Sequence, residues 1–191
     1  YVSPQVRDEI LTGRAKLEGG LRDVSILFAD LRGFTSWVES TDPTVVVADL
    51  NAYFTEMDAA IRDNGGLVLQ FIGDEIEAVF GAPNADDSHA DHAVAAALAM
   101  QERLDAWNVA RRTSGKPEMH HGIGIHSGKV VAGSIGSASR MSYSLVGDVV
   151  NVASRIQSLN KELGTRVLVS AVTRQNLSVK PPMRPFPSVR V

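Results

Sequence analysis

The stretch LVLQFIGDEIEAVF, residues 67–80, predicts two β-strands joined by a tight turn. Apolar residues dominate 67–72 and 76–80, and Gly73 with Asp74 supplies the turn between them. A hairpin of this kind is the centre of the predicted fold, because the segments on either side of it are organised in the same way.

A helix is expected on each side of the hairpin, and a strand beyond each helix. Upstream, Asp42-Pro43 opens a helix with apolar residues at spacings of three and four, and Asn64-Gly65-Gly66 ends it. Downstream, Asp87-Ser88 caps an alanine-rich helix that runs to about Arg112. The outer strands are expected at 23–30 and 119–126. This order predicts an α+β fold with a ferredoxin-like βαββαβ core.

The C-terminal part is expected to add an extra hairpin, a helix and strands to this core. Residues 128–136 and 141–146 read as the hairpin, 148–163 as the helix and 166–169 as a strand. Residues 4–16 read as a short helix, so 1–19 are expected to be an N-terminal helix or linker from a longer protein. The main domain then covers 20–191. Because 187–191 read as a strand that stops short, we expect this domain to be truncated at its C-terminal end.

The composition is that of an ordinary globular domain and excludes several classes. The 191 residues are 44% hydrophobic and 21% charged, and the net charge of −3 does not favour a nucleic-acid partner. Because cysteine is absent, disulfides and thiolate metal sites are excluded. No apolar run approaches the roughly 18 residues of a membrane span. We therefore expect no membrane contact from this segment.

Two aspartates stand where the predicted sheet would place a metal site. Asp30 ends the first strand, and Asp74 lies at the turn of the hairpin expected beside it. Hard divalent ions such as Mg²⁺ prefer carboxylate oxygens and take one or two of them from the protein. Each aspartate also has a simpler reading, Asp30 as a helix cap and Asp74 as a turn residue. The turn after Asp30 leads into a short helix, whose N–H groups can face phosphate.

Four segments together resemble one enzyme family. FADLRGFT (28–35), FIGDEIEAVFGAP (71–83), GIGIHSGKVVAG (122–133) and YSLVGDVVNVASR (143–155) resemble, in this order, the class III adenylyl and guanylyl cyclases. The resemblance implies an enzyme that makes a 3′,5′-cyclic nucleotide from a nucleoside triphosphate. It also implies a head-to-tail homodimer with its active sites at the interface. A cytoplasmic location follows from where that substrate occurs.

The resemblance assigns metal and phosphate contacts to one part of the chain. Asp30 and Asp74 would hold two Mg²⁺ or Mn²⁺ ions per site, with the carbonyl of Leu31 as a further ligand. The residues of the following turn would contact the triphosphate, namely Gly33, Phe34 and Thr35. Arg140 is a further candidate for phosphate, or a solvated arginine at the end of a hairpin.

The partner chain would supply the remaining groups. Asn151 would orient the ribose, and Arg155 would stabilise charge on the α-phosphate. The two residues are four apart on one predicted helix, so both can point into one cleft. The expected reaction is attack of the ribose 3′-hydroxyl on the α-phosphate with release of pyrophosphate.

The base-reading positions depart from both branches of the family. Where adenylyl members commonly have lysine with aspartate or threonine, and guanylyl members glutamate with cysteine, this chain has Gln70 and Ser144. Each of these side chains can donate or accept. Adenine presents an acceptor at N1 and a donor amine, and guanine presents the reverse. The interpretation favours ATP with relaxed selectivity, and a guanylyl or mixed-specificity cyclase is the alternative. Glu77 replaces a residue that is often methionine or another apolar residue.

Two further functions stay open at this point. A degenerate domain could bind nucleotide or only dimerise to pass a signal, which Gln70, Ser144 and the lack of a C-terminal triphosphate-contacting lysine favour. A diguanylate cyclase is also conceivable, because residues 72–76 resemble the Gly-Gly-Asp-Glu-Phe hairpin of that family. That family gives no role to Asn151 and Arg155.

Overall fold

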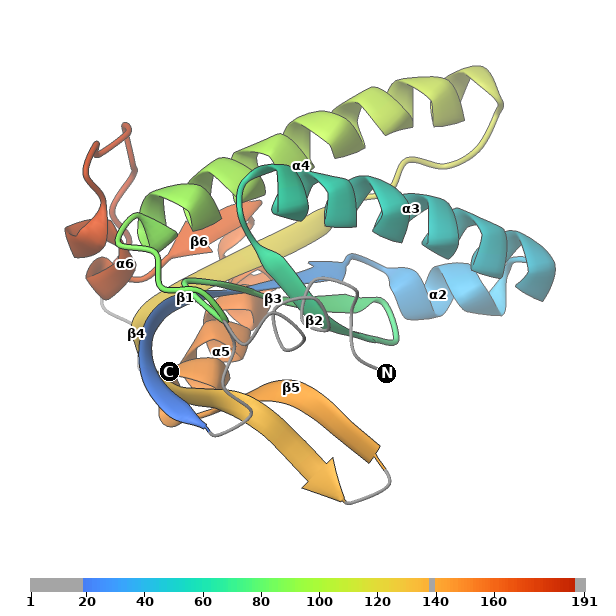
Figure 1. The fold of residues 1–191 in the computed structure, drawn as a ribbon. Helices are drawn as coiled ribbons and strands as arrows, with labels where there is room; N and C mark the ends of the chain where they lie inside the picture. Colours follow the sequence, from blue (N-terminus) through green and yellow to red (C-terminus); the bar gives the residue numbers. More distant parts are fainter. Residues whose placement is uncertain (1–18, 138–139, 188–191) are drawn as a thin grey trace.

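The computed structural model describes residues 19–137 and 140–187 (Figure 1). The helix predicted at 4–16 lies outside the described residues, as do residues 188–191 of the strand predicted at 187–191.

One six-stranded sheet forms the centre of the molecule (Figure 1). Its main path runs β2-β3-β1-β4-β5, and β6 pairs with β4 in parallel. The strands are β1 (Gly20–Leu31), β2 (Leu67–Ile72), β3 (Glu75–Phe80), β4 (His121–Ser137), β5 (Arg140–Val146) and β6 (Val167–Val169). The order β2-β3-β1-β4, with a helix on each crossover, confirms the ferredoxin-like βαββαβ core.

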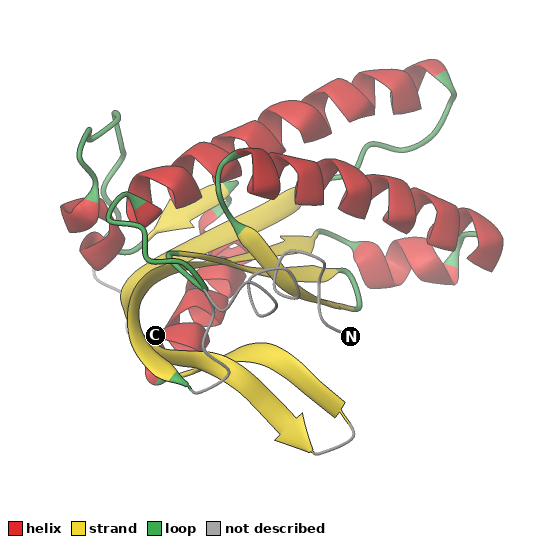
Figure 2. Cartoon of the chain, in the orientation of Figure 1, coloured by secondary structure: helices red, strands yellow, loops and turns green. Residues whose placement is uncertain are grey.

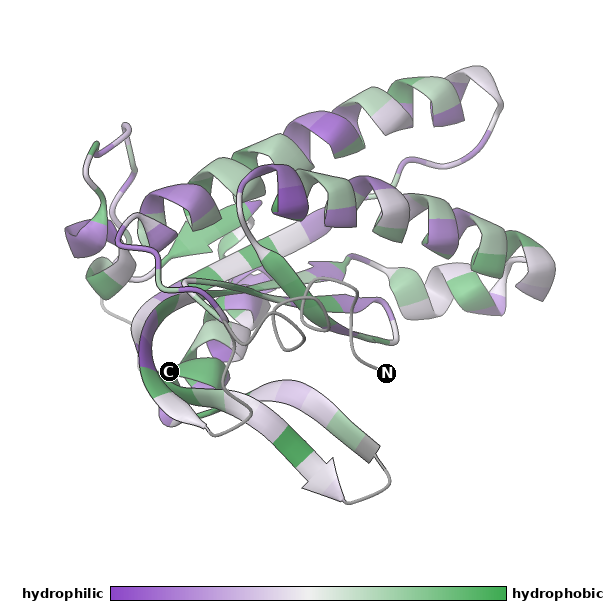
Figure 3. Cartoon of the chain, in the orientation of Figure 1, coloured by the Kyte–Doolittle hydropathy of each residue, from purple (hydrophilic) through white to green (hydrophobic). Residues whose placement is uncertain are grey.

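Helices cover both faces of this sheet, as Figure 2 shows. The helices α3 (Pro43–Asp63) and α4 (His89–Thr113) lie on one face, and α5 (Asp148–Leu163) lies on the other. Two short helices complete the chain, α2 (Phe34–Glu39) and α6 (Ala171–Asn176). Figure 3 shows hydrophobic and hydrophilic residues alternating along α3 and α4, as expected of helices with one buried side.

The alternation of side chains along β1 separates two hydrophobic cores. Leu27 and Ala29 pack with the residues of α3 and α4. Ile26 and Phe28 point to the other face and join a core that includes Ala153 of α5. Successive residues of a strand point to opposite faces, so the next residue in the second series, Asp30, belongs to the α5 side of the sheet.

One expectation about the strands is wrong. The segments predicted at 119–126 and 128–136 form a single strand of 17 residues, β4. The hairpin itself is confirmed, because the end of β4 pairs antiparallel with β5. The break expected before Gly128 is absent, since Gly128 pairs with Val24 in the middle of the sheet. A glycine is needed at position 128 because a Cβ there would lie 2.7 Å from Cγ2 of Val149 on α5.

The contact between β4 and α5 is close along its whole length. A Cβ added at Gly124 would lie 2.2 Å from the backbone nitrogen of Gln157, and one at Gly122 would lie 2.9 Å from Cβ of Asn160. The side-chain amide of Asn160 donates to the carbonyl of Ile123 at 2.9 Å. The glycines of β4 therefore fix how deeply α5 sits against the sheet.

Candidate active site

The carboxyl groups of Asp30 and Asp74 lie close enough for each to feel the other, since Asp74 raises the pKa of Asp30. Asp30 is near the end of β1, and Asp74 follows Gly73, whose φ of 63° shapes the turn between β2 and β3. Burial is the largest influence on Asp30 and, with the hydrogen bond and negative charge of Asp74 and the charge of Glu75, raises its pKa to about 7. The two aspartates therefore lie near each other, and their role as metal ligands stays a prediction.

This pair suits a divalent cation. Two carboxylates held together at a partly buried position repel each other unless a proton or a cation lies between them. The described residues hold no group of three or more His, Asp or Glu side chains arranged to bind a metal. A cation bound here would therefore complete its shell with backbone oxygens, such as the Leu31 carbonyl, with substrate and with water. The residues fit Mg²⁺ or Mn²⁺, which often keep only one or two protein carboxylates.

A neutral buried pair lies close to the aspartates. The hydroxyl of Tyr53 and Nδ1 of His121 are 2.9 Å apart, and both side chains are almost completely buried. Burial raises the pKa of Tyr53, and the charges of Asp30 and Asp74 raise it further. Burial lowers the pKa of His121 to about 3, so its ring is neutral at neutral pH. Sequence reasoning missed this pair, because its two members come from α3 and β4.

The turn after β1 is held in an unusual backbone shape. Gly33 has a φ of 68°, and nothing lies within 4 Å of where its Cβ would be. It precedes α2, whose Phe34 ring packs on Trp37 with centroids 5.9 Å apart. Thr35 is exposed. The three residues expected to contact triphosphate therefore lie together, three to five positions beyond Asp30.

Arg32 ties this turn to the far end of α5. Its backbone N–H donates to the carbonyl of His120 at 2.8 Å. Its guanidinium donates to the carbonyls of Thr165 and Asn160, at the C-terminal end of α5. The turn and the helix are thus joined within one chain.

Asn151 and Arg155 lie on α5 one turn apart, and both are exposed. Neither side chain makes a hydrogen bond or an ion pair with any residue in 19–137 or 140–187. A single chain therefore brings the two aspartates together but does not bring these two residues into contact with them.

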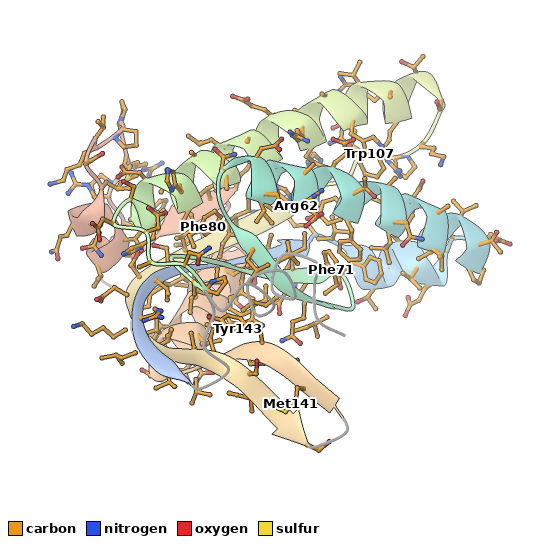
Figure 4. The ribbon with its side chains drawn as sticks, in the orientation of Figure 1. Arg62, Phe71, Phe80, Trp107, Met141 and Tyr143 are labelled. Atoms are coloured by element: carbon orange, nitrogen blue, oxygen red, sulfur yellow. The ribbon has the colours of Figure 1, made fainter. Side chains whose placement is uncertain are left out.

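The two base-reading candidates also lie apart within one chain. Gln70 is on β2 and Ser144 is on β5, the strands at the two ends of the main sheet path. Ser144 is half-buried and lies opposite Gly133. Figure 4 shows Tyr143 and Met141 along β5, with Tyr143 nearer to the body of the molecule. Arg140 begins β5, and its side chain is outside the described part of the structure.

Gln70 has a partner that the sequence did not predict. Its Nε2 donates to Oε2 of Glu77 at 2.7 Å. Glu77 is only 6% exposed and lies directly opposite Gln70 in the neighbouring strand. No sequence pattern marks the two as a pair, although the unexpected glutamate was itself a signal.

A protein-family comparison now places the chain. Residues 19–185 match the family model described as the adenylate and guanylate cyclase catalytic domain. The chain belongs to this family. The resemblance noted in the sequence is therefore confirmed over nearly all of the described residues.

Curated relatives of this cyclase domain carry adenylate cyclase names. It is 44% identical to adenylate cyclase 1 of Rhizobium meliloti (strain 1021) over 149 residues, which are 78% of this chain and 22% of that protein. It is 40% identical to an adenylate cyclase of Anabaena cylindrica over 181 residues, which are 93% of this chain and 34% of that protein. The cyclase domain thus spans between about a fifth and a third of these relatives.

A solved structure from the other branch is also similar. The crystal structure of the guanylyl cyclase Cya2 superimposes with a TM-score of 0.78 and 38% sequence identity, over 84% of this chain and 81% of that one. The cyclase domain therefore resembles both branches. Among its described helices, none is both long enough and apolar enough to cross a bilayer.

Proposed function

We propose that this cyclase domain converts ATP to 3′,5′-cyclic AMP and pyrophosphate, as a homodimer with two sites at its interface. The observation that carries the proposal is the contact between Asp30 and Asp74, which presents two acidic groups to a divalent cation at the edge of the sheet. The names of the two curated relatives support ATP over GTP.

The chain's own groups have distinct tasks in this reaction. Mg²⁺ or Mn²⁺ held at Asp30 and Asp74 would make the ribose 3′-hydroxyl more acidic and neutralise triphosphate charge. The backbone at Gly33 and Phe34 offers N–H groups to the phosphates at the start of α2. Catalysis of phosphoryl transfer consists mainly of positioning and charge stabilisation, so no covalent intermediate with the protein is needed.

The exposed α5 residues support a site shared between two chains. Arg155 has no carboxylate partner in the described residues, so its charge is available to an anion from outside the chain. Asn151, one turn earlier, can donate and accept hydrogen bonds to a ribose. In a head-to-tail homodimer, α5 of each chain would face the aspartates of the other, and the two identical contacts would create two sites.

The decisive experiment mixes two inactive variants. Asp30→Ala and Arg155→Ala should each abolish formation of cyclic AMP from ATP and Mn²⁺. Their equimolar mixture should regain activity, because a heterodimer has one site with both groups intact and reaches up to about half the activity of the natural dimer. Asp63→Ala is the matched control, since this exposed aspartate pairs, within the described part of the chain, only with Arg103, and its loss should leave the rate unchanged.

The same assay separates the alternatives. If Asp30→Ala retains full activity, the metal role of the two aspartates is wrong. If the mixture stays inactive while each variant is folded and dimeric, the shared site is wrong. If the unmodified protein forms no cyclic product from ATP or GTP yet binds either nucleotide, it is a degenerate signalling domain.

A further inference from the structure

The contact between Gln70 and Glu77 joins an exposed amide to a buried acid. Gln70 Nε2 donates to Glu77 Oε2 at 2.7 Å, and Glu77 is 6% exposed. Burial raises the pKa of Glu77, and the hydrogen bond from Gln70 opposes that rise. The amide is therefore the contact that favours the ionised form of this acid.

An irregularity in the sheet creates this contact. Val68 pairs with Ala78, but Gln70 pairs with Glu77, so Leu69 is an extra residue in β2. Such a β-bulge redirects the side chains that follow it. With regular pairing, Leu69 would lie opposite Glu77, and Gln70 would point to the other face of the sheet. The bulge thus places an amide where the buried acid needs a donor.

The chemistry of the two groups fixes the direction of the amide. The Gln70 NH₂ faces Glu77, because it donates the hydrogen bond that the carboxylate oxygen accepts. The other end of the amide, Oε1, has no hydrogen-bond partner among the described residues. A negative charge on Glu77 also polarises the amide of Gln70, which makes Oε1 a stronger hydrogen-bond acceptor.

We propose that Glu77 makes Gln70 a hydrogen-bond acceptor toward the purine, and thereby admits GTP as a second substrate of the site. This rests on the proposed function and on the base-reading position that the family resemblance gives to Gln70. Adenine has a bare acceptor at N1, whereas guanine has an N–H at N1 and an amine at C2. A fixed acceptor therefore matches the N–H groups of guanine, and it can meet adenine only at its amine and not at N1. Glu77 is a positioning residue, since it acts on the nucleotide only through Gln70.

The test compares two substrates in variants of Glu77. Glu77→Met removes the acceptor, so that Gln70 can rotate and donate to adenine N1. The ratio of kcat/KM for ATP to that for GTP should rise about tenfold, which corresponds to about 1.4 kcal/mol. Glu77→Gln, of the same size, allows both directions of the Gln70 amide and should raise the ratio by a smaller factor. If Glu77→Met does not fold, Glu77→Gln still measures the change in the ratio.

A second pair of variants isolates the role of Gln70. In a Gln70→Ala background, the same two substitutions at Glu77 should leave the ATP-to-GTP ratio of kcat/KM unchanged. Glu77 then has no amide through which to act on the base, and the double-mutant cycle measures this coupling. A merely structural glutamate would lower both activities together without changing their ratio.

Three results would overturn the inference. They are a ratio within about twofold of the natural one in both Glu77 variants, a fall in that ratio, or an equal rise in the Gln70→Ala background. Absence of both cyclic products from the unmodified protein would instead refute the proposed function. A cyclase in which Glu77 does not influence base choice is therefore distinguishable from a domain without cyclase activity.

Discussion

Gly124→Ala tests whether the depth of α5 against the sheet controls both stability and activity. The added Cβ would lie 2.2 Å from the backbone nitrogen of Gln157 and 2.4 Å from its Cα. Ordinary contacts of a Cβ begin near 3.4 Å. Because the obstructing atoms belong to a helix backbone, they cannot rotate away, and α5 must retreat by about 1 Å.

The expected cost follows from overpacking. Extra atoms in a packed interior cost typically 1–3 kcal/mol, and a backbone obstacle places this variant near the upper value, about 3 kcal/mol. Domains of this size have roughly 5–15 kcal/mol of stability, so the variant should remain folded. Displacement of a catalytic group by 1 Å can cost about 100-fold in rate. Cyclase activity should therefore fall far more than the folded fraction, because Asn151 and Arg155 move with α5.

Urea unfolding and cyclase kinetics on the same samples measure the two effects. Gly20→Ala is the matched control, since its added Cβ would lie 3.7 Å from the flexible guanidinium of Arg22. That variant should stay within about 0.5 kcal/mol of the unmodified protein. The reasoning is refuted if Gly124→Ala is as stable and as active as this control.

Two further predictions concern buried charge. Asp49→Ala should lower the free energy of unfolding by about 3–5 kcal/mol, because it leaves Arg111, which is 3% exposed, without its carboxylate. Asp105→Ala, at an exposed ion pair, should cost less than about 1 kcal/mol in the same urea titration. In the metal-free domain, stability should fall as pH rises from 4 to 7, since the folded state binds the Asp30 proton more tightly, its pKa being about 7 against 3.8 for the free side chain. Asp30→Asn should flatten that part of the pH profile, and an unchanged slope would contradict the assignment.

Much of the fold follows from local signals in the sequence. Asp42 caps α3 by accepting from the N–H of Thr44 at 2.8 Å, and the helix ends at Asp63, next to the predicted Asn64. Two features were missed for physical reasons. Gly128 marks a close approach of α5 rather than the boundary between two strands, and a glycine is compatible with either. The helix α6 spans six residues, too few to show a helical period.

The candidate site was predictable only in part. The topology alone places Asp30 beside the turn that carries Asp74, so their contact could be expected before the structure. The pairing of Gln70 with Glu77 depends on one extra residue in β2, which no alternation of polar and apolar residues encodes. The roles proposed for Asn151 and Arg155 require a second chain, so the sequence pattern of one chain does not encode their contacts.

The bridge formed by Arg32 has a consequence for the proposed dimer. Arg32 connects the turn beyond Asp30 to the carbonyls that end α5, and these two regions belong to different sites if the sites are shared between chains. A shift of the turn when nucleotide binds at one site would then be passed through a single rigid chain to the neighbouring site. Occupancy of the first site would alter affinity at the second, and the two halves of the enzyme would not work independently.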